Sequence, residues 1–539
     1  MNKKKLLWMT SLMLVGAIMI AACGTAATAE PPAVAPVEEE PAAPAEEVPV
    51  EEVPAEPERG VMTVAHSNEW GGNEELDPAS PTRFQNVAYP LFDRMIDLDV
   101  NGRPKGRLLV SWEADEIAQT WTFQVRQGVT FHDGKPLTAR DIVYTMRNVL
   151  DPEFASPAAA ALSLVDVDGL QVLDDYTVVV PLTQPHSDFP LLLTDYRLRV
   201  IPEGSKDDPN SPDYLEKTGN GTGPFRLETL DIDGITVLVA NDDYWDGPPG
   251  LAGINVVGIA DSDARVQALL AGQIDMMENV AAEQAKQIEG NPGYTILELP
   301  SGNWAPLSMS VITSPFDDIR VRQALKLVVD RAEMLAIVAQ GAGVIACDSP
   351  VHPSDQYYLK QECPQDIERA KELLAEAGYA DGLTVDLHVS DIRPLMIPMA
   401  VTFKEQAAEA GITVNIITEP SDGYWSDVWL KDSFVAGNWG ERHADQVLNE
   451  VFRCDAAWNE IDWCNEEYEQ LMDAARSELD FEKRLTLYHQ AQELLVADGG
   501  EIIPFFLSAT RIFNSLLVGL PERSDDIYDW QAFRFEPGE

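Results

Sequence analysis

Two consecutive segments in the second half of the chain repeat one order of patterns, and this order restricts the fold more than any other feature. Residues 368–390 run from an amphipathic helical pattern through a glycine-containing turn into an alternating stretch rich in β-branched residues. Residues 400–419 repeat that order. Helix-then-strand units with short glycine turns are typical of α/β domains. The sequence therefore predicts a largely parallel sheet here.

Strand and helix patterns are also mixed elsewhere. Residues 120–134 alternate apolar and polar side chains and end in a turn sequence, which predicts a strand. Residues 136–150 predict a helix, with Thr138 as N-cap and Asp141 three residues later in a box-like pattern. Residues 225–247 predict a hairpin around an Asp-Gly pair. Residues 317–341 predict one long amphipathic helical region.

The N-terminus has the layout of an export signal. Three lysines near the start are followed by a mostly apolar stretch that ends at Ala22. We therefore expect residues 1–22 to be a signal peptide. Residues 20–23 resemble a bacterial lipobox, which implies cleavage before Cys23 and acylation of its sulfur. An uncleaved anchor helix is the alternative.

Residues 23–59 predict a tether behind this cysteine. Proline, alanine and glutamate dominate the segment, and aromatic residues are absent. Such a composition cannot bury enough apolar surface to fold, and its prolines favour an extended chain. We expect a disordered, semi-stiff spacer between the lipid and the folded body.

The charge and length of the chain exclude some classes of function. With 539 residues the chain is expected to form two to four domains. The formal net charge of -52 argues against nucleic acid as a partner and against docking of the folded body on anionic lipid. After the signal no stretch reaches about 18 uninterrupted apolar residues, so the rest is expected to be extracytoplasmic and soluble.

Four cysteines remain besides the one at the lipobox, and export permits disulfides. We expect the sequence-local pairs Cys347–Cys363 and Cys454–Cys464. Each would close a short loop and stabilise it by about 3 kcal/mol. A zinc site is the alternative, but the Cys-x-x-Cys spacing of structural zinc sites is absent.

No motif for catalysis stands out. G-x-S-x-G, H-E-x-x-H and the phosphate-binding loop pattern are all absent, and the seven histidines are scattered. We therefore expect no enzyme activity, no cofactor and no metal site. A surface hydrolase with paired carboxylates is the alternative from another class, although in so acidic a chain a chance pair carries no weight.

Several stretches, taken together and in order, resemble the extracytoplasmic solute-binding proteins of ABC transporters, in the family (family 5) that binds oligopeptides, dipeptides and nickel. The resemblance covers nearly everything from Gly60 onward. The stretches that carry it are residues 123–146, 221–259, 268–276, 317–331 and 368–382.

This resemblance implies a fold and its domain boundaries. The fold would be α/β and type II periplasmic-binding-protein-like, with two lobes joined by a hinge and an extra subdomain on the first lobe. The first lobe would span residues 60–305 with the subdomain inserted at about 91–215. The second lobe would span residues 306–508, and residues 509–539 would return to the first lobe. Ligand would bind between the lobes.

The segment around Arg442 is the first candidate for the ligand site. In the peptide-binding relatives a tryptophan followed by an aspartate lies in the cleft, and the aspartate pairs with the peptide ammonium. Here Trp439 matches, Asn438 precedes it, Arg442 stands where that aspartate is expected, and Asp445 matches a second acid. An arginine suits a carboxylate or phosphate instead. As alternatives, Arg442 pairs with Glu441, Asp445 or another acid of the wall, or lies on the surface.

Other candidates also follow from the resemblance. Arg393 stands before a proline, where an arginine of dipeptide-binding relatives clasps the ligand carboxylate; its alternative is a loop pair with Asp391. Trp304 and Trp70 fall in segments that line the family's cleft, where each could stack on a ligand or pack in the core. Glu69 is a candidate acceptor for an ammonium group.

The function implied is that of a receptor. We expect a lipid-anchored, monomeric protein on the extracytoplasmic side of the membrane that captures short peptides and delivers them to an ABC permease. It would touch the membrane only through its lipid and would not bind nucleic acid. An oligosaccharide or a nickel chelate is the alternative ligand, and a chaperone-like surface lipoprotein is a further alternative role.

Overall fold

The computed structural model of the chain describes residues 59–67, 71–278, 280–523 and 528–536. The expected signal peptide, Cys23 and the tether up to residue 58 lie outside the described residues, and so do Glu69 and Trp70. Contacts group residues 58–539 into one compact unit. Within the described ranges, no helix combines the length and the apolar character needed to cross a membrane.

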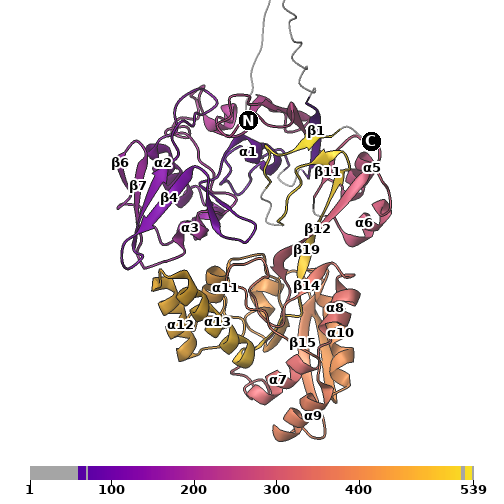
Figure 1. Ribbon diagram of the computed structural model, residues 1–539. Coiled ribbons are helices and arrows are strands. Elements are labelled where there is room, and N and C mark those ends of the chain that lie inside the picture. Colours follow the sequence, from indigo (N-terminus) through magenta and orange to yellow (C-terminus); the bar gives the residue numbers. More distant parts are fainter. Residues whose placement is uncertain (1–58, 68–70, 279, 524–527, 537–539) are drawn as a thin grey trace, which may run out of the picture. The chain divides into compact units, whose positions relative to one another are not determined.

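An eight-stranded sheet collects strands from both ends of the chain (Figure 1). Its order is β12-β19-β11-β1-β10-β9-β8, with β14 paired to β19 off this path. Strand β1 lies parallel to β10 and β11, and β8 and β9 form the expected hairpin. The bounds are β1 Val61–His66, β8 Phe225–Thr229, β9 Ile235–Ala240, β10 Gly253–Gly258, β11 Met276–Met277, β12 Tyr294–Trp304, β14 Gly343–Ile345 and β19 Phe505–Asn514.

Four short helices belong to the same region of the chain. Their apolar side chains join two clusters with alternate residues of the sheet, such as Met62 and Val64 of β1. The bounds are α1 Gln85–Leu91, α4 Leu215–Thr218, α5 Ser262–Leu270 and α6 Ala282–Ile288.

A five-stranded sheet forms the second core, in the order β16-β15-β17-β13-β18. Strands β15 and β16 are parallel over eight residue pairs, and helices α9 and α10 precede them in the chain, which confirms the predicted helix–strand units. Leu383, Val385 and Leu387 are buried while the residues between them are more exposed. The bounds are α9 Ile367–Glu376, α10 Met396–Ala408, β13 Leu307–Met309, β15 Leu383–Ser390, β16 Ile412–Glu419, β17 Phe434–Ala436 and β18 Glu501–Ile502.

A separate four-stranded sheet, β4-β5-β7-β6, has its own core together with helix α2. The expected cap of this helix is present, since the backbone N–H of Thr138 donates to Asp141 Oδ2 at 2.7 Å. The bounds are β4 Leu109–Ala114, β5 Thr120–Val125, α2 Ala139–Leu150, the 3-10 helix η1 Pro157–Leu162, β6 Gln171–Asp174, β7 Thr177–Pro181 and α3 Phe189–Leu192.

The prediction of one helical region over residues 317–341 is wrong in one respect. The structure divides it into α7, Ile319–Leu327, and α8, Arg331–Val338. Asp330 ends the break by accepting a hydrogen bond from the backbone N–H of Glu333 at 2.9 Å. An aspartate that can cap a new helix starts one here, although the helical spacing of apolar residues continues across it.

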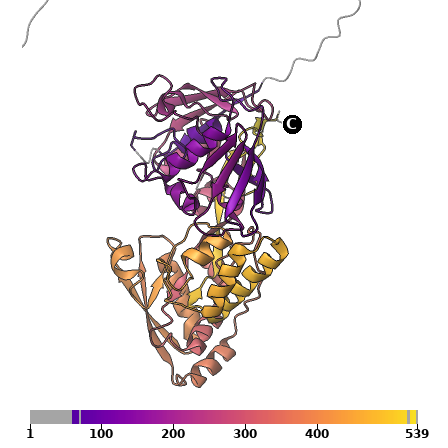
Figure 2. The same cartoon turned by 90° about the vertical axis from the view of Figure 1, so that its left-hand side faces the viewer.

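Helices α12 and α13 pack side by side and, with α11, form a further core (Figures 1 and 2). The disulfides Cys347–Cys363 and Cys454–Cys464 are the two sequence-local pairs. The bounds are the π-helix η2 Tyr424–Val428, α11 Ala444–Glu450, α12 Glu466–Ser477 and α13 Phe481–Asp498. Two small antiparallel sheets complete the elements of the described residues: β2 Ile96–Leu98 with β3 Pro104–Gly106, and β20 Leu517–Val518 with β21 Arg534–Phe535.

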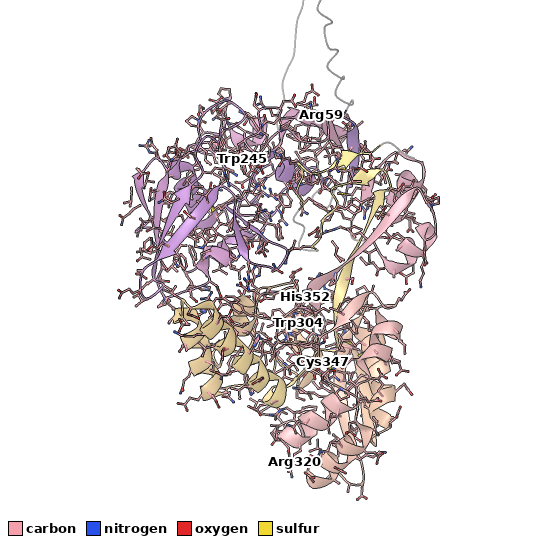
Figure 3. All side chains as sticks on the ribbon, in the orientation of Figure 1. Arg59, Trp245, Trp304, Arg320, Cys347 and His352 are labelled. Atoms are coloured by element: carbon pink, nitrogen blue, oxygen red, sulfur yellow. A yellow bond between two sulfur atoms is a disulfide. The ribbon has the colours of Figure 1, made fainter. Side chains whose placement is uncertain are left out.

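Two of the connections between the eight-stranded and five-stranded sheets are short crossings. The chain passes from β12 to β13 between Trp304 and Leu307, and it returns from β18 to β19 between Ile502 and Phe505. Because β12 and β19 are neighbours in one antiparallel ladder, the two crossings lie together. Figure 3 shows Trp304 where the first crossing begins.

Candidate ligand-binding site

A cavity of about 400 Å³ lies beside the crossings. One wall is made by residues 192–197, which follow the four-stranded sheet, and the opposite wall by residues 440–446, which lead into α11. Residues of β12 and β19 complete the lining. Its polar side chains include Asp195, Tyr196, Arg197, Asn303, Arg442 and His443. Of the residues expected at the site, Arg442 lines this cavity.

Arg442 pairs with an acid that the sequence analysis did not single out. Its Nε donates to Glu450 Oε2 at 3.0 Å, and one terminal nitrogen donates to the carbonyl oxygen of Gly440 at 3.1 Å. Neither Glu441 nor Asp445 is its partner. A guanidinium has five N–H groups, and within the described residues only these two bonds engage Arg442. The remaining N–H groups are free for a ligand.

Trp439 and Trp304 form a stack behind Arg442. Their ring centres are 5.8 Å apart with planes 16° from parallel. The two backbones exchange hydrogen bonds of 2.8 and 3.1 Å, which fix the segment of Trp439 against the end of β12. Trp304 is 1% exposed and Trp439 is 6% exposed. Trp304 is therefore a core residue here, and the surface it supports is the face of Trp439.

Three more tryptophans extend this stack, and the sequence analysis missed them. Trp429 and Trp458 lie 5.9 and 5.8 Å from Trp439, and Trp425 lies 5.6 Å from Trp429. The guanidinium carbon of Arg442 lies 5.1 Å from the ring centre of Trp439 and 5.7 Å from that of Trp458, which gives two cation–π contacts. We call these five residues, Trp304, Trp425, Trp429, Trp439 and Trp458, the tryptophan cluster.

The disulfide Cys454–Cys464 closes the loop from which Trp458 contacts Arg442. Trp458 lies inside the loop that this bridge closes, and 41% of its surface is exposed. The sequence offered one signal, a tryptophan between two cysteines expected to pair. No spacing rule connects such a loop to the segment of Trp439.

Glu460 lies beneath the tryptophan cluster. Its carboxylate accepts the indole N–H of Trp439 at 2.6 Å and also the indole N–H of Trp429. It is 4% exposed, and burial raises its pKa. A Cβ at Gly437 would lie 3.1 Å from Glu460 Oε2 and 2.7 Å from the ring of Pro306, so only glycine leaves room at this position.

Asp445 is engaged on all sides. His186 Nε2 lies 2.9 Å from its Oδ2, Arg476 reaches both oxygens at 3.0 and 2.9 Å, and the hydroxyl of Tyr488 donates at 2.8 Å. Burial alone would raise the pKa of Asp445, but His186 and Arg476 hold it well below its ordinary value. The carboxylate is 3% exposed, so the structure gives it the place of a structural anion rather than of a free acceptor.

Arg393 and Asn438 are both exposed. Arg393 follows β15 in the turn that leads to α10, and the expected alternative, a pair with Asp391, is not formed. Within the described part of the chain, neither Arg393 nor Asn438 has a side-chain partner. Neither belongs to the lining of the cavity. A role in ligand binding remains a prediction for both.

The opposite wall carries an arginine that the sequence analysis also missed. Arg197 holds Asp195 with two nitrogens, at 2.8 and 2.5 Å, and its guanidinium carbon lies 5.0 Å from the ring centre of Tyr196. Burial alone would lower the pKa of Arg197, but Asp195 raises it. The cavity thus has a guanidinium on each wall and a carboxylate beside each one.

A group of metal-binding side chains lies elsewhere. His388 Nδ1 is 2.9 Å from Glu419 Oε1 and 3.5 Å from Asp432 Oδ2. Neighbouring strands bring these residues together from distant positions, which the absence of a local cluster in the sequence did not predict. The shorter contact is a hydrogen bond between His388 and Glu419, so both side chains already have a partner.

Comparison with known proteins places these features in a family. The model named "Bacterial extracellular solute-binding proteins, family 5 Middle" matches residues 103–456. The dipeptide-binding protein of Escherichia coli strain K12 is 28% identical over 478 residues, which cover 81% of this chain and 87% of that protein.

Solved structures match over nearly their whole length. The unliganded open form of the periplasmic murein tripeptide-binding protein MppA has a TM-score of 0.79 at 20% identity, over 89% of this chain and 97% of that one. The oligopeptide-binding protein AppA of Bacillus subtilis, in complex with a nonapeptide, has a TM-score of 0.65 at 22% identity, over 89% of this chain and 100% of that one. Both likenesses concern the fold.

Proposed function

Because the chain belongs to the bacterial extracellular solute-binding proteins of family 5, we propose that it captures short peptides between its two lobes and delivers them to the permease of an ABC importer. Its fold is the type II periplasmic-binding-protein fold of that family. A solute-binding protein is a transport receptor and not an enzyme.

The observation that carries the peptide proposal is the charge pattern of the cavity. The free N–H groups of Arg442 suit a carboxylate. Asp195 on the opposite wall is already paired with Arg197, and Glu441 of the lining offers negative charge to an ammonium group. A net charge of -52 repels free anions, whereas a zwitterion escapes this repulsion. The cavity volume of about 400 Å³ lies within the range of small-molecule sites.

Ligand binding is proposed to close the lobes. The TM-score is higher with an unliganded open form than with a peptide complex, which supports an open arrangement in this structure. The crossing between Trp304 and Leu307, and the return from Ile502 into the first residues of β19, are the proposed hinge. We place the first lobe at residues 60–305 and 509–539, with the subdomain at about 91–215, and the second lobe at 306–508. A ligand that contacts both walls would shift the equilibrium toward closure.

The location outside the cytoplasm follows from the family. We propose in addition that Cys23 carries the lipid that holds the protein to the membrane, and that the receptor acts as a monomer. Residues 23–59 would then act as the spacer. Labelling with radioactive palmitate tests the anchor, since Cys23→Ser should abolish incorporation; equal labelling of the variant would contradict it.

The experiment that tests the ligand is mass spectrometry of what the purified protein releases on denaturation. Short-peptide masses would support the proposal and give the preferred length. An oligosaccharide series or a nickel chelate would retain the receptor and reject the peptide. If nothing is released, a dipeptide and tripeptide library is screened by melting temperature, which a bound ligand raises. A library without any stabilising peptide would reject the peptide as ligand.

A further inference from the structure

Two acidic side chains meet in the interior below the tryptophan cluster. Glu460 is 4% exposed and Glu501, the first residue of β18, is 1% exposed. Their carboxyl groups are hydrogen-bonded to each other. Two carboxyl groups can share a hydrogen bond only if one of them carries the proton. The contact therefore requires one protonated acid in a site closed to water.

The other contacts show which acid keeps the proton. Glu460 accepts indole N–H groups from Trp429 and Trp439, and two such donors favour its ionised form. Glu501 receives only a 3.3 Å contact from Ser308, and its Oε1 has no other partner among the described residues. Burial, and then the negative charge of Glu460, raises the pKa of Glu501 well above its ordinary value. Glu501 is the protonated member.

Few charged groups face this pair. Lys326 of α7 is the neighbouring cation; burial lowers its pKa to about 8, and its Nζ donates to the carbonyl oxygen of Val496 at 2.8 Å. Tyr424 is near enough to Glu460 to interact with its charge, and its hydroxyl donates to the carbonyl oxygen of Ala436 at 2.8 Å. Asp348, Arg322 and Arg331 lie around Lys326. None of these groups bonds the acid pair directly.

We propose that Glu460 is a positioning residue of the ligand site, that the protonated carboxyl group of Glu501 holds it in place by donating a hydrogen bond to it, and that loss of the Glu501 proton weakens ligand binding. The proposal rests on the proposed function. Glu460 orients Trp429 and Trp439, and Trp439 carries the guanidinium of Arg442. When both acids are ionised they repel each other, and the indole N–H groups lose their fixed acceptor. Binding is therefore strongest at low pH and falls as the pH rises.

The first experiment uses the protein without ligand. Infrared spectroscopy at neutral pH should show the carbonyl band of a buried protonated carboxylic acid, and Glu501→Gln should remove it. Near-ultraviolet circular dichroism should show a transition of the tryptophan signal with rising pH in the wild type. Glu501→Gln keeps an N–H donor at every pH and should abolish this transition. Glu372→Gln, at an exposed surface pair, is the control that leaves both signals unchanged.

The second experiment measures binding of dialanine by calorimetry between pH 5 and pH 9. The wild-type affinity should fall at least about tenfold across this range, and the affinity of Glu501→Gln should stay constant. Glu460→Gln should bind about tenfold more weakly at every pH, because the two indoles bond different oxygens of Glu460 and glutamine replaces one of these oxygens with an NH2 donor. An infrared band or a circular dichroism transition that persists in Glu501→Gln would overturn the acid pair. If dialanine fails to bind while both signals behave as expected, the choice of ligand fails and the acid pair stands.

Discussion

His186 Nε2 and Asp445 Oδ2 lie 2.9 Å apart in an almost fully buried contact. His186 follows β7 of the four-stranded sheet, and Asp445 lies in the first turn of α11. Beside them, the backbone N–H of Ser187 donates to the carbonyl oxygen of Arg476 at 2.8 Å. The segment that follows β7 is therefore attached to α11 and α12 at a place other than the crossings of β12 and β19.

Replacement of His186 by alanine should lower the free energy of unfolding by about 3 kcal/mol. A hydrogen bond to a charged group contributes about 1.5–3 kcal/mol, and removal of the buried imidazole also leaves a cavity, so the upper end applies although Asp445 keeps Arg476 and Tyr488. Urea denaturation measures the loss. Lys135→Ala, at a pair whose lysine is 69% exposed, is the control and should change stability little. Equal effects of the two variants would refute the contact's role.

The stability of the fold should depend on Asp445 at acid pH. Its folded pKa lies well below the ordinary value of 3.8, so the folded state binds a proton less readily than the unfolded state. The stabilisation from this carboxylate is complete above about pH 4 and is lost as the pH falls through the folded pKa. Urea midpoints measured between pH 2 and pH 7 should therefore fall more steeply in the wild type than in Asp445→Asn. Parallel curves would show that another group governs acid unfolding.

Replacement of Arg442 by alanine should weaken binding of a peptide with a free carboxylate at least about tenfold, or about 1.4 kcal/mol. The variant loses the free N–H groups at the cavity but only a partly exposed ion pair, so its stability should change by less than about 1 kcal/mol. Calorimetry with a peptide and its amide tests this. Lysine should restore binding only in part, because it lacks the planar fork. Arg369→Ala, at an exposed pair, is the matched control. If peptide and amide lose affinity equally, Arg442 does not bind the carboxylate.

Replacement of Arg393 by alanine tests whether this side chain binds the carboxylate of the ligand. The side chain is exposed and unpaired among the described residues, so the variant should keep the wild-type melting temperature. If Arg393 reaches the ligand on closure, affinity for the free peptide falls while affinity for its amide stays the same. Unchanged affinity for both would remove Arg393 from the site.

Each disulfide should stabilise the fold separately. The bridges span sequence separations of 16 and 10 residues, and loops of this size correspond to about 3 kcal/mol in the chain-entropy model. Serine pairs at Cys347 and Cys363 and at Cys454 and Cys464 should each lower the unfolding free energy by about that amount. Only the second pair should also weaken ligand binding, because it releases Trp458 from Arg442. If the two serine pairs have equal effects on ligand binding, Trp458 does not contribute to the site.

The parts of the fold that could be predicted are those with a local signal. Residues 368–390 and 400–419 carry their helix, turn and strand in sequence, and the structure forms the parallel pair of β15 and β16 from them. The cap of α2 depends on two residues three positions apart. The break between α7 and α8 was missed because Asp330 competes with an apolar pattern that continues through it.

Sequence alone predicted only those site residues that lie together in one segment of the chain. Arg442 and Trp439 share a segment and lie together, as their spacing suggested. Trp458, Glu460 and Arg197 come from other parts of the chain and are brought there by a disulfide loop and by the opposite wall. No pattern of composition or spacing along the chain predicts such contacts between distant residues. The partner of Arg442, Glu450, lies two helical turns further on, where any of several acids would have satisfied the sequence pattern.

The position of β19 also sets the order in which the protein can fold. This strand lies between β12 and β11 inside the eight-stranded sheet, and Met276 pairs with Phe513 near its end. Strands β11 and β12 therefore cannot complete their pairing until β19, one of the last segments to be synthesised, is present. Until it arrives, β11 and β12 keep unpaired edges, which are templates for aggregation, and pairing across so long a separation is slow. A chain truncated just before Phe505 would keep every strand of the five-stranded sheet. It would lack β19 and so disrupt the eight-stranded sheet, whose first strand, β1, lies near the opposite end of the sequence.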